Sequence, residues 1–530
     1  MPLFPFKGAI MKRTYKYKAG NKEIEREVSY IPVRYIFAML ITVFEIISII
    51  GVVVALCYFV PYFYLLCWVT EIVCVIKIIA SNDNPDYKIP WLLFVLILPI
   101  AGFMLYLIFY SRKLQKKYIK RLNDLKEYKQ ERDDTEIMAE LKKSDPVSFN
   151  QAKMLCNISG SHIYKSTSQR YFFSGEMMHE SMLSDLEIAE KFIYLEYFII
   201  EEGKFWDSIL EILKKKAQKG IDVRVLYDDV GCMNTLPGNY AKILTDYGIM
   251  ATPFSRLKGQ ADSEFNNRSH RKIMVIDGYI GYTGGVNIAD EYINEIVKFG
   301  HWKDVGIRLE GEAVCGLTEL FLTDFGINFK ELKSPHKDIY PAHKVEANGY
   351  VIPFGDGPRP LYDRRVGKSA IQNILASATE YVYITTPYLI IDNELCTAIE
   401  NTAIKGIDVR IITPHIPDKK LVFSMTRSFY SRLINAGVKI YEYTPGFIHA
   451  KTVVSDGKYA MVSTINLDYR SLVHHFENGV WLYNADCIED IYRDISETLE
   501  KSEKIKKEDL KTNIFARIVR SLVRIFAPLL

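Results

Sequence analysis

The chain has 530 residues, of which 49% are hydrophobic and 25% are charged, and its formal net charge is +3. Its length suits two lobes with additional segments better than a single domain. So small a positive charge, without a stripe of basic and aromatic residues, argues against a nucleic-acid-binding protein. The eight cysteines are scattered and show no paired spacing, which argues against a disulfide framework and against a zinc site.

Three apolar runs in the first 110 residues predict transmembrane helices. They cover residues 35–59, 62–80 and 91–110 and follow a basic tail over residues 1–34. The last run has 20 residues without a charge, and a helix of that length crosses a hydrocarbon core of ~30 Å. The polar tail lacks a small-residue cleavage pattern, so we expect no cleaved signal peptide. The sequence therefore predicts an integral membrane protein with two or three transmembrane helices.

The basic residues around these runs set a condition on their number. Eight Lys or Arg residues lie between residues 7 and 34, before the first run, and six lie between residues 112 and 121, after the third. The positive-inside rule favours the cytoplasm for both flanks, which requires an even number of crossings. Three crossings do not meet this condition. Either one run is re-entrant or lies in the interface, or one basic flank lies outside.

Charged segments precede and follow the central region of the chain. Residues 111–150 are dense in Lys, Arg, Glu and Asp, which favours a solvated helical linker. Residues 506–530 predict a basic amphipathic helix, which either lies on an anionic membrane surface or packs back onto the protein. Its apolar positions are Ile514, Phe515, Ile518, Val519, Leu522, Val523 and Phe526, and its arginines are Arg517, Arg520 and Arg524.

A short pattern, His-x-Lys-x₄-Asp, occurs twice in the central region. The first copy is His270, Lys272 and Asp277, and the second copy is His449, Lys451 and Asp456. After six further residues, each copy continues with two small residues, one apolar residue and an asparagine; the asparagines are Asn287 and Asn466. A single copy can arise by chance, but two copies with matching tails indicate a duplicated functional unit.

The repeat extends beyond this motif. The sequence KGIDVR occupies residues 219–224 and recurs unchanged at residues 405–410. In each half it follows an apolar strand and an amphipathic helix, so each half predicts strand, helix, strand, loop and strand. This order is typical of an α/β fold with a mixed or parallel sheet. We predict two pseudo-symmetric lobes, residues 151–335 and 336–505, joined near residues 333–344.

The residue types in the motif suit chemistry on a phosphate. Residues 272–276 and 451–455 are mostly β-branched or apolar and predict buried strands. Residues two apart on a strand share a face, so the His and the Lys of each copy are expected to point the same way. The ammonium neutralises phosphate oxygens, and the imidazole attacks or donates a proton. Because neither copy holds both a base and an acid, we expect the copies to face each other and to share one site.

These motifs resemble those of bacterial cardiolipin synthases in the phospholipase D superfamily. The resemblance rests on residues 267–292 (NRSHRKIMVIDGYIGYTGGVNIADEY), 300–304 (GHWKD), 386–388 (TPY), 436–451 and 466–471 (NLDYRS). It runs from about Pro61 to the C-terminus. It implies the fold of that superfamily, with two lobes of mixed sheet flanked by helices, behind N-terminal transmembrane helices in the bacterial plasma membrane.

The resemblance also implies residue roles. One His becomes a phosphohistidine and the other protonates the leaving alcohol, with His270 favoured as nucleophile and His449 as acid. Asp304 and Glu477 match the acids that orient His270 and His449, and Asn287 and Asn466 are expected to donate to phosphate oxygens. Asp277 and Asp456 are expected to hold loops rather than to touch the substrate. The second tail, Ser463-Thr464, departs from the Gly that the family usually has at its first position.

The implied reaction condenses two phosphatidylglycerol molecules into cardiolipin and glycerol, on an anionic membrane and without a cofactor or metal. Hydrolysis by a phospholipase D, cleavage of nucleic acid by a membrane-tethered nuclease and phosphatidylserine synthesis would use the same residues. A catalytically inactive scaffold is the alternative outside enzymology, and the complete set of six His, Lys and Asp residues argues against it. The eight other histidines are expected to be structural. They are His162, His179, His301, His336, His343, His415, His474 and His475.

Overall fold

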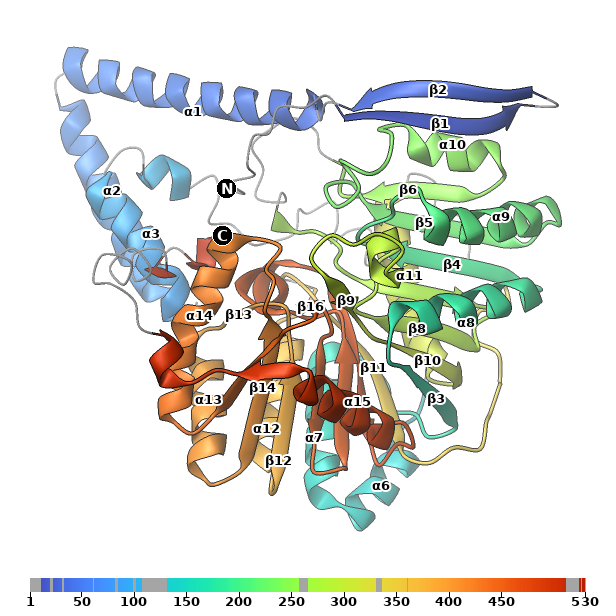
Figure 1. Cartoon of the computed structure of the whole chain (residues 1–530). Coiled ribbons are helices and arrows are strands. Elements are labelled where there is room, and N and C mark those ends of the chain that lie inside the picture. Colours follow the sequence, from blue (N-terminus) through green and yellow to red (C-terminus); the bar gives the residue numbers. More distant parts are fainter. Residues whose placement is uncertain are drawn as a thin grey trace.

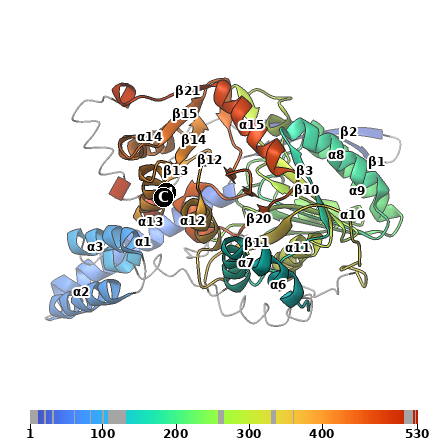
Figure 2. The same ribbon diagram turned by 90° about the horizontal axis from the view of Figure 1, so that it is seen from below.

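The structure of the chain is a computed structural model. It describes residues 11–19, 22–30, 33–60, 62–81, 84–98, 102–106, 131–256, 266–329, 336–359, 361–510, 524–525 and 527–529. Figure 1 shows two α/β lobes side by side, with the first N-terminal helix across the top of the view and the next two along the left flank. Figure 2 shows that helices α2 (Phe63–Ala80) and α3 (Pro85–Ile97) lie on the side of the second lobe.

The N-terminal part begins with a β-hairpin and continues with three helices. Strands β1 (Met11–Ala19) and β2 (Lys22–Tyr30) pair antiparallel within the predicted basic tail. Helices α1 (Val33–Phe59), α2 (Phe63–Ala80) and α3 (Pro85–Ile97) follow. Within the described ranges, α2 is the one helix whose length and composition suit a membrane crossing, and α1 contains a shorter apolar stretch.

The prediction of one continuous helix over residues 91–110 is wrong. Helix α3 begins at Pro85 and ends at Ile97, and residues 102–106 are again helical; residues 99–101 lie outside the described residues. The sequence explains the break, because a residue that precedes proline is disfavoured in the α conformation, and Pro99 follows Leu98. Leu98 has φ −123° and ψ 72°, outside the helical region. Residues 107–110 lie outside the described residues.

The first lobe contains a seven-stranded mixed sheet. Its strand order is β3-β10-β8-β7-β4-β5-β6. The strands are β3 (Thr167–Phe172), β4 (Phe192–Tyr197), β5 (Asp222–Asp228), β6 (Met250–Phe254), β7 (Lys272–Ile276), β8 (Ile280–Gly284) and β10 (Gly306–Gly311). The helices are α8 (Gly175–Ile188), α9 (Lys204–Gln218), α10 (Tyr240–Asp246) and α11 (Val314–Asn328).

The second lobe contains an eight-stranded sheet of order β11-β20-β18-β17-β12-β14-β15-β21. The strands are β11 (Tyr350–Asp356), β12 (Tyr381–Thr385), β14 (Asp408–Pro414), β15 (Lys439–Tyr443), β17 (Thr452–Ser455), β18 (Tyr459–Ser463), β20 (Glu477–Tyr483) and β21 (Ser502–Lys504). The helices are α12 (Val366–Ser377), α13 (Asn393–Ile404), α14 (Lys420–Asn435) and α15 (Ile488–Glu500).

The two sheets repeat one arrangement, as the duplicated sequence predicts. In each lobe the strand of the His motif, β7 or β17, pairs antiparallel with β4 or β12, which in turn pairs parallel with β5 or β14. The predicted α/β class and the two mixed sheets are confirmed. One buried apolar cluster draws on both lobes and includes Ile307, Val351 and Val480, so the lobes share a core.

Two segments at the edges of the lobes pack against the second lobe. Helices α6 (Thr135–Ser144) and α7 (Pro146–Ser159) contribute Leu141, Ala152 and Leu155 to the buried core of the second lobe. The predicted domain boundary at residue 150 therefore falls inside α7. Most of the predicted C-terminal helix lies outside the described residues. Of its described part, the guanidinium carbon of Arg524 lies 4.2 Å from the ring centroid of Phe429, and Ala527 is buried in the same core.

Candidate active site

The two His motifs meet at the boundary between the lobes. Each histidine stands just before its central strand, and its backbone N–H donates to a carbonyl of the opposite lobe. His270 N donates to Phe476 O at 2.8 Å, and His449 N donates to Lys303 O at 2.7 Å. Strand β16 (Gly446–Ile448) also pairs with β9 (His301–Lys303) across this boundary. The lobes are thus joined by backbone hydrogen bonds at the two motifs, and the motifs lie in one place.

Each imidazole is held by a carboxylate from the other lobe. His270 Nδ1 lies 2.9 Å from both carboxylate oxygens of Glu477, and His449 Nδ1 lies 2.6 Å from Asp304 Oδ2. The sequence identified these two acids, and the structure pairs them crosswise. A carboxylate on Nδ1 fixes the tautomer and leaves Nε2 as the reacting nitrogen.

The two motif lysines are buried beside the histidines. Lys272 Nζ donates to His270 O at 2.7 Å, and Lys451 Nζ donates to His449 O. Each lysine therefore folds back along its own motif, as expected for residues that share a face. Burial lowers the pKa of Lys272 well below its usual value and lowers that of Lys451 to about 8. Two ammonium groups in one buried site favour the binding of an anion, because an anion offsets both charges.

The motif aspartates lie at the far end of the strands and bind backbone. Asp277 accepts N–H groups from residues 190–192, just before and at the start of β4, at 2.8 Å. Asp456 accepts N–H groups from residues 379–381, at the start of β12, at 2.8 to 3.0 Å. Their φ angles are 52° and 55°, in the left-handed region that Asp tolerates better than most residues. This geometry matches the expectation that both hold loops.

The two motif asparagines differ in their surroundings. Asn287 Nδ2 donates to the hydroxyl of Tyr292 at 2.7 Å, and its Oδ1 accepts from Ile199 N. The Tyr292 ring centroid lies 5.4 Å from that of His449, so Asn287 contacts a residue that touches the site. The Oδ1 of Asn466 is buried and has no hydrogen-bond partner among the described residues. Both side chains retain N–H capacity for a phosphate oxygen.

The two orienting acids have different environments, although the lobes repeat each other. Glu477 accepts the hydroxyl of Thr464, whereas Asp304 faces Gly285, where a Cβ would lie 2.0 Å from Asp304 Oδ1. Burial raises the pKa of Asp304 to about 7. Burial also acts to raise the pKa of Glu477, but the interaction with His270 outweighs it and lowers that pKa below its usual value. The Glu477 carboxylate is therefore ionised at neutral pH, and the Asp304–His449 pair retains an additional proton up to about pH 7.

The protonation of the two histidines follows from these surroundings. Burial lowers the pKa of His270 to about 3, and the charge of Lys272 adds to this effect. At neutral pH His270 is therefore an uncharged imidazole whose Nδ1–H donates to Glu477, with a lone pair on Nε2. Burial also lowers the pKa of the His449 imidazole, and the additional proton of its pair is held together with Asp304. The two carboxylate–imidazole pairs thus differ in protonation at neutral pH.

A third imidazole, which the sequence analysis assigned to structure, lies at the site. The ring centroids of His475 and His270 are 5.6 Å apart, and His475 Nδ1 lies 3.8 Å from Glu477 Oε1. Ligand atoms of His270, His475 and Glu477 lie within 4.8 Å of one another, so these three residues could hold a metal ion. The sequence held one feature that could have placed His475 at the site. It lies two residues before Glu477, and residues two apart in an extended segment share a face.

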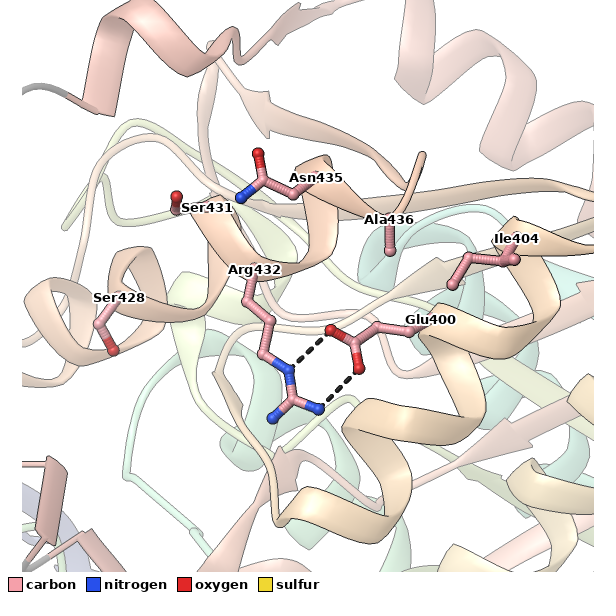
Figure 3. A pocket seen from close by; sticks show the side chains of 7 residues that line it. All are labelled: Glu400, Ile404, Ser428, Ser431, Arg432, Asn435 and Ala436. Carbon is pink, nitrogen blue, oxygen red and sulfur yellow. Dashed lines mark hydrogen bonds and ion pairs between the residues drawn. The ribbon is translucent and has the colours of Figure 1, made fainter.

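A separate hollow on the surface contains none of the motif residues. It lies between α13 and α14, where the guanidinium of Arg432 donates two hydrogen bonds, of 2.7 and 2.6 Å, to the carboxylate of Glu400 (Figure 3). The other lining residues are Ile404, Ser428, Ser431, Asn435 and Ala436. The residues that line the hollow include no histidine and no cysteine.

Comparison with known proteins places this geometry in a family. A family model described as cardiolipin synthase, PLD-like domain, matches residues 182–297 and 371–499, and one described as phospholipase D-nuclease N-terminal matches residues 72–109. A cardiolipin synthase of Geobacillus kaustophilus is 34% identical over 477 residues, which are 88% of this chain and 92% of that protein. The chain belongs to the cardiolipin synthase family. The resemblance drawn from the sequence is thereby confirmed.

Other relatives agree with this assignment. Cardiolipin synthase 2 of Bacillus cereus is 35% identical over 86% of this chain and 88% of its own length. An uncharacterized protein of Streptococcus mutans is 44% identical over 86% of this chain and 99% of its own length. The crystal structure of a phosphatidylserine synthase from Haemophilus influenzae matches with a TM-score of 0.55 at 16% identity, over 72% of this chain and 98% of that chain. At this identity the crystal structure supports the shared fold alone.

The crosswise pairs predict the effect of removing each orienting charge. Glu477→Gln and Asp304→Asn should each lower kcat by roughly 10²- to 10⁴-fold, because a neutral amide no longer fixes the imidazole tautomer. Turnover of the purified variants on phosphatidylglycerol vesicles measures this loss, and thermal unfolding in detergent serves as the folding control.

Asp456→Ala is the matched control for these variants. It removes an acceptor of three backbone N–H groups without touching an imidazole. We expect it to lower the free energy of unfolding by about 1–3 kcal/mol and to spare the turnover of the folded protein. If Glu477→Gln and Asp304→Asn lower only the unfolding temperature and keep normal turnover, the two acids are structural and this assignment is wrong.

Proposed function

We propose that the chain is a membrane-bound phosphatidyltransferase that condenses two phosphatidylglycerol molecules into cardiolipin and glycerol. The observation that carries the proposal is the site itself, with two imidazoles held by carboxylates from opposite lobes beside two buried lysines. Such a site suits attack on a phosphodiester, whose charge the lysines offset. Family membership directs this chemistry toward a phospholipid.

In the first half of the reaction, His270 Nε2 attacks the phosphorus of a bound phosphatidylglycerol. The bond from phosphorus to the glycerol oxygen breaks, and the proton of the Asp304–His449 pair passes from His449 Nε2 to that oxygen. Free glycerol leaves, and the phosphatidyl group stays on His270 as a phosphohistidine. Lys272 and Lys451 stabilise the charge that develops on the other phosphate oxygens.

In the second half, the headgroup hydroxyl of another phosphatidylglycerol attacks the phosphohistidine. His449 now accepts the hydroxyl proton, the bond between phosphorus and His270 breaks, and cardiolipin forms. Covalent catalysis divides one difficult displacement into two easier ones. Because one phosphodiester is exchanged for another, the reaction should also run backwards when glycerol is abundant.

The N-terminal helices support a location in the bacterial plasma membrane. Side chains of α2 such as Leu66, Trp68 and Ile76 are more than half exposed, although they are strongly apolar. Exposed apolar surface along a whole helix is expected where lipid, not water, surrounds it. We therefore propose a multi-pass membrane protein whose partners are phosphatidylglycerol and other anionic lipids.

The first prediction for this function concerns the product. Purified protein in phosphatidylglycerol vesicles should release one glycerol for each cardiolipin formed, as measured by mass spectrometry of the lipids and an enzymatic glycerol assay. Protein quenched in detergent at neutral pH should carry an acid-labile phosphatidyl adduct on His270. Phosphatidic acid as the main product would establish hydrolysis instead, and phosphatidylserine formed from a serine acceptor would establish the other transferase.

Histidine variants provide the control for this experiment. His270→Ala and His449→Ala should each lower cardiolipin formation by about 10³-fold or more, and the double variant should be no worse, because the two groups act as a unit. The matched control is His162→Ala. His162 lies away from the site and forms a hydrogen bond with Asp134, so this variant should leave turnover unchanged. A large residual activity in either motif variant would contradict the shared centre.

The protonation states predict how activity depends on pH. His270, with a pKa of about 3, is uncharged throughout the neutral range, so it sets no limit there. The Asp304–His449 pair loses its additional proton above about pH 7, and Lys451 loses its charge near pH 8. We expect kcat/KM to fall as the pH rises from about 7 to about 9. A profile that stays level to pH 9 would exclude the pair as the proton donor.

The cluster of His270, His475 and Glu477 predicts a response to metal ions. A transition-metal ion bound there would engage the nucleophile and its orienting acid, so micromolar Zn²⁺ should inhibit cardiolipin formation, and EDTA should reverse the inhibition. His475→Asn should weaken the inhibition at least tenfold and retain turnover. EDTA alone should leave the activity unchanged, and loss of activity on chelation would show that the reaction requires a metal.

A further inference from the structure

The start of helix α3 is docked on the second lobe through polar side chains. Asn84 Nδ2 donates to Asp392 Oδ2 at 3.0 Å, and Asp86 Oδ2 accepts from Asn393 N at 2.8 Å and from the hydroxyl of Tyr469 at 3.1 Å. The ring of Tyr87 is buried in the core of this lobe, and its hydroxyl lies 3.0 Å from His474 Nε2. Residues 84–87 are therefore on the same side of the membrane as the catalytic lobes.

The chain returns to the lobes at residue 131. Arg132 Nη2 lies 3.1 Å from a carboxylate oxygen of Glu312, and Asp134 Oδ2 lies 2.8 Å from His162 Nδ1. Both partners belong to the described lobes. Because residues 87 and 131 lie on one side, the chain between them crosses the bilayer an even number of times. A single crossing by residues 91–110, the simplest interpretation of the sequence, is incompatible with these contacts.

The described residues within this segment turn back on themselves. Helix α3 has 13 residues and is about 20 Å long, shorter than a hydrocarbon core of ~30 Å. The ring centroids of Trp91 and Tyr106 are 5.8 Å apart, whereas 15 residues of straight helix would separate them by about 22 Å along its axis. Gly102 permits the close approach, because a Cβ there would lie 2.0 Å from the Phe94 carbonyl oxygen.

The two ends of α3 have opposite polarity. At its first turn, Lys88 Nζ donates to the carbonyls of Ile79 and Ser81 at the end of α2, so this corner carries a positive charge beside the lobe. At its last turn, Leu96, Ile97 and Leu98 are 47 to 69% exposed. A charged corner suits the headgroup layer, and an exposed apolar tip suits the hydrocarbon beneath it.

We propose that α3 and residues 102–106 form a re-entrant hairpin in the leaflet that faces the catalytic lobes. The hairpin enters that leaflet, turns within it and returns. Helix α2 makes one crossing, and we assign the second crossing to α1, whose apolar stretch is shorter. Both basic flanks, residues 7–34 and 112–121, then lie with the lobes, and the positive-inside rule places all of them in the cytoplasm. The inference rests on the membrane location proposed above and assigns its topology.

The hairpin also links the membrane to the active site. Tyr87 contacts His474, the last residue of the π-helix η4 (Arg470–His474), and the next residues along the chain are His475, Phe476 and Glu477. The hairpin therefore contacts the segment that holds the orienting acid of His270. A lipid in the cytoplasmic leaflet would reach the site beside this hairpin without leaving the leaflet.

Cysteine labelling of the full-length protein tests the topology. In a variant whose eight native cysteines are alanine and which retains activity, single cysteines replace Tyr62, Ser111 or Ile404. Intact spheroplasts and lysed membranes are treated with a membrane-impermeant maleimide. We expect Tyr62→Cys to be labelled in intact spheroplasts, and Ser111→Cys and the lobe reporter Ile404→Cys to be labelled at least tenfold more strongly after lysis.

The possible results are distinct. Labelling of Ser111→Cys together with Tyr62→Cys in intact spheroplasts would overturn the hairpin, because the segment would then cross once. Labelling of Ser111→Cys and Ile404→Cys, but not Tyr62→Cys, in intact spheroplasts would overturn the cytoplasmic assignment. Release of the protein from membranes by alkaline carbonate would instead refute the membrane location itself. If the cysteine-free variant is inactive, short epitopes inserted after Tyr62 or Ser111 in the natural chain give the same readout with antibodies.

Discussion

The active site depends on two carboxylate–imidazole pairs that each join one lobe to the other. Glu477 of the second lobe holds His270 of the first, and Asp304 of the first holds His449 of the second. Neither lobe can orient its own histidine, so the lobes must be assembled before either imidazole is correctly placed. The backbone bonds from His270 to Phe476 and from His449 to Lys303 fix the relative position of the lobes at the same points. The contacts that join the two lobes are therefore also the contacts that orient the two imidazoles.

The duplicated site is not symmetric, and the asymmetry suits the two steps of the reaction. A hydroxyl donor at Thr464 stabilises the charge on Glu477, whereas Gly285 stands where no side chain fits beside Asp304. The Glu477 carboxylate stays ionised beside an uncharged His270, while Asp304 shares a proton with His449. Repeated strands supply the positions of the two pairs, and the protonation differs because burial dominates at Asp304, whereas interactions with His270 and His475 outweigh burial at Glu477.

The sequence predicted the repeated lobes and the strand over residues 272–276, because strand periodicity and motif spacing are local properties. The roles of the site residues stay predictions. It did not predict which acid meets which imidazole, since that depends on how two lobes of similar sequence face each other. His475 was assigned to structure because a histidine in isolation carries little information. The break in the third apolar run was missed because apolar composition alone does not show where a helix ends, although Pro99 was a local signal for it.

The packing of α7 has a consequence for synthesis of the protein on the ribosome. Helix α7 emerges before the first lobe, yet Ala152 and Leu155 are buried against the second lobe, whose first strand begins at Tyr350. At a translation rate of about 5–20 residues per second, the apolar face of α7 lacks its partner for roughly 10–40 s. The first lobe can fold in that interval, but the apolar face of α7 stays exposed on the nascent chain and is prone to aggregation. Attachment of the preceding segment to the bilayer would keep that helix away from neighbouring nascent chains until the second lobe is complete.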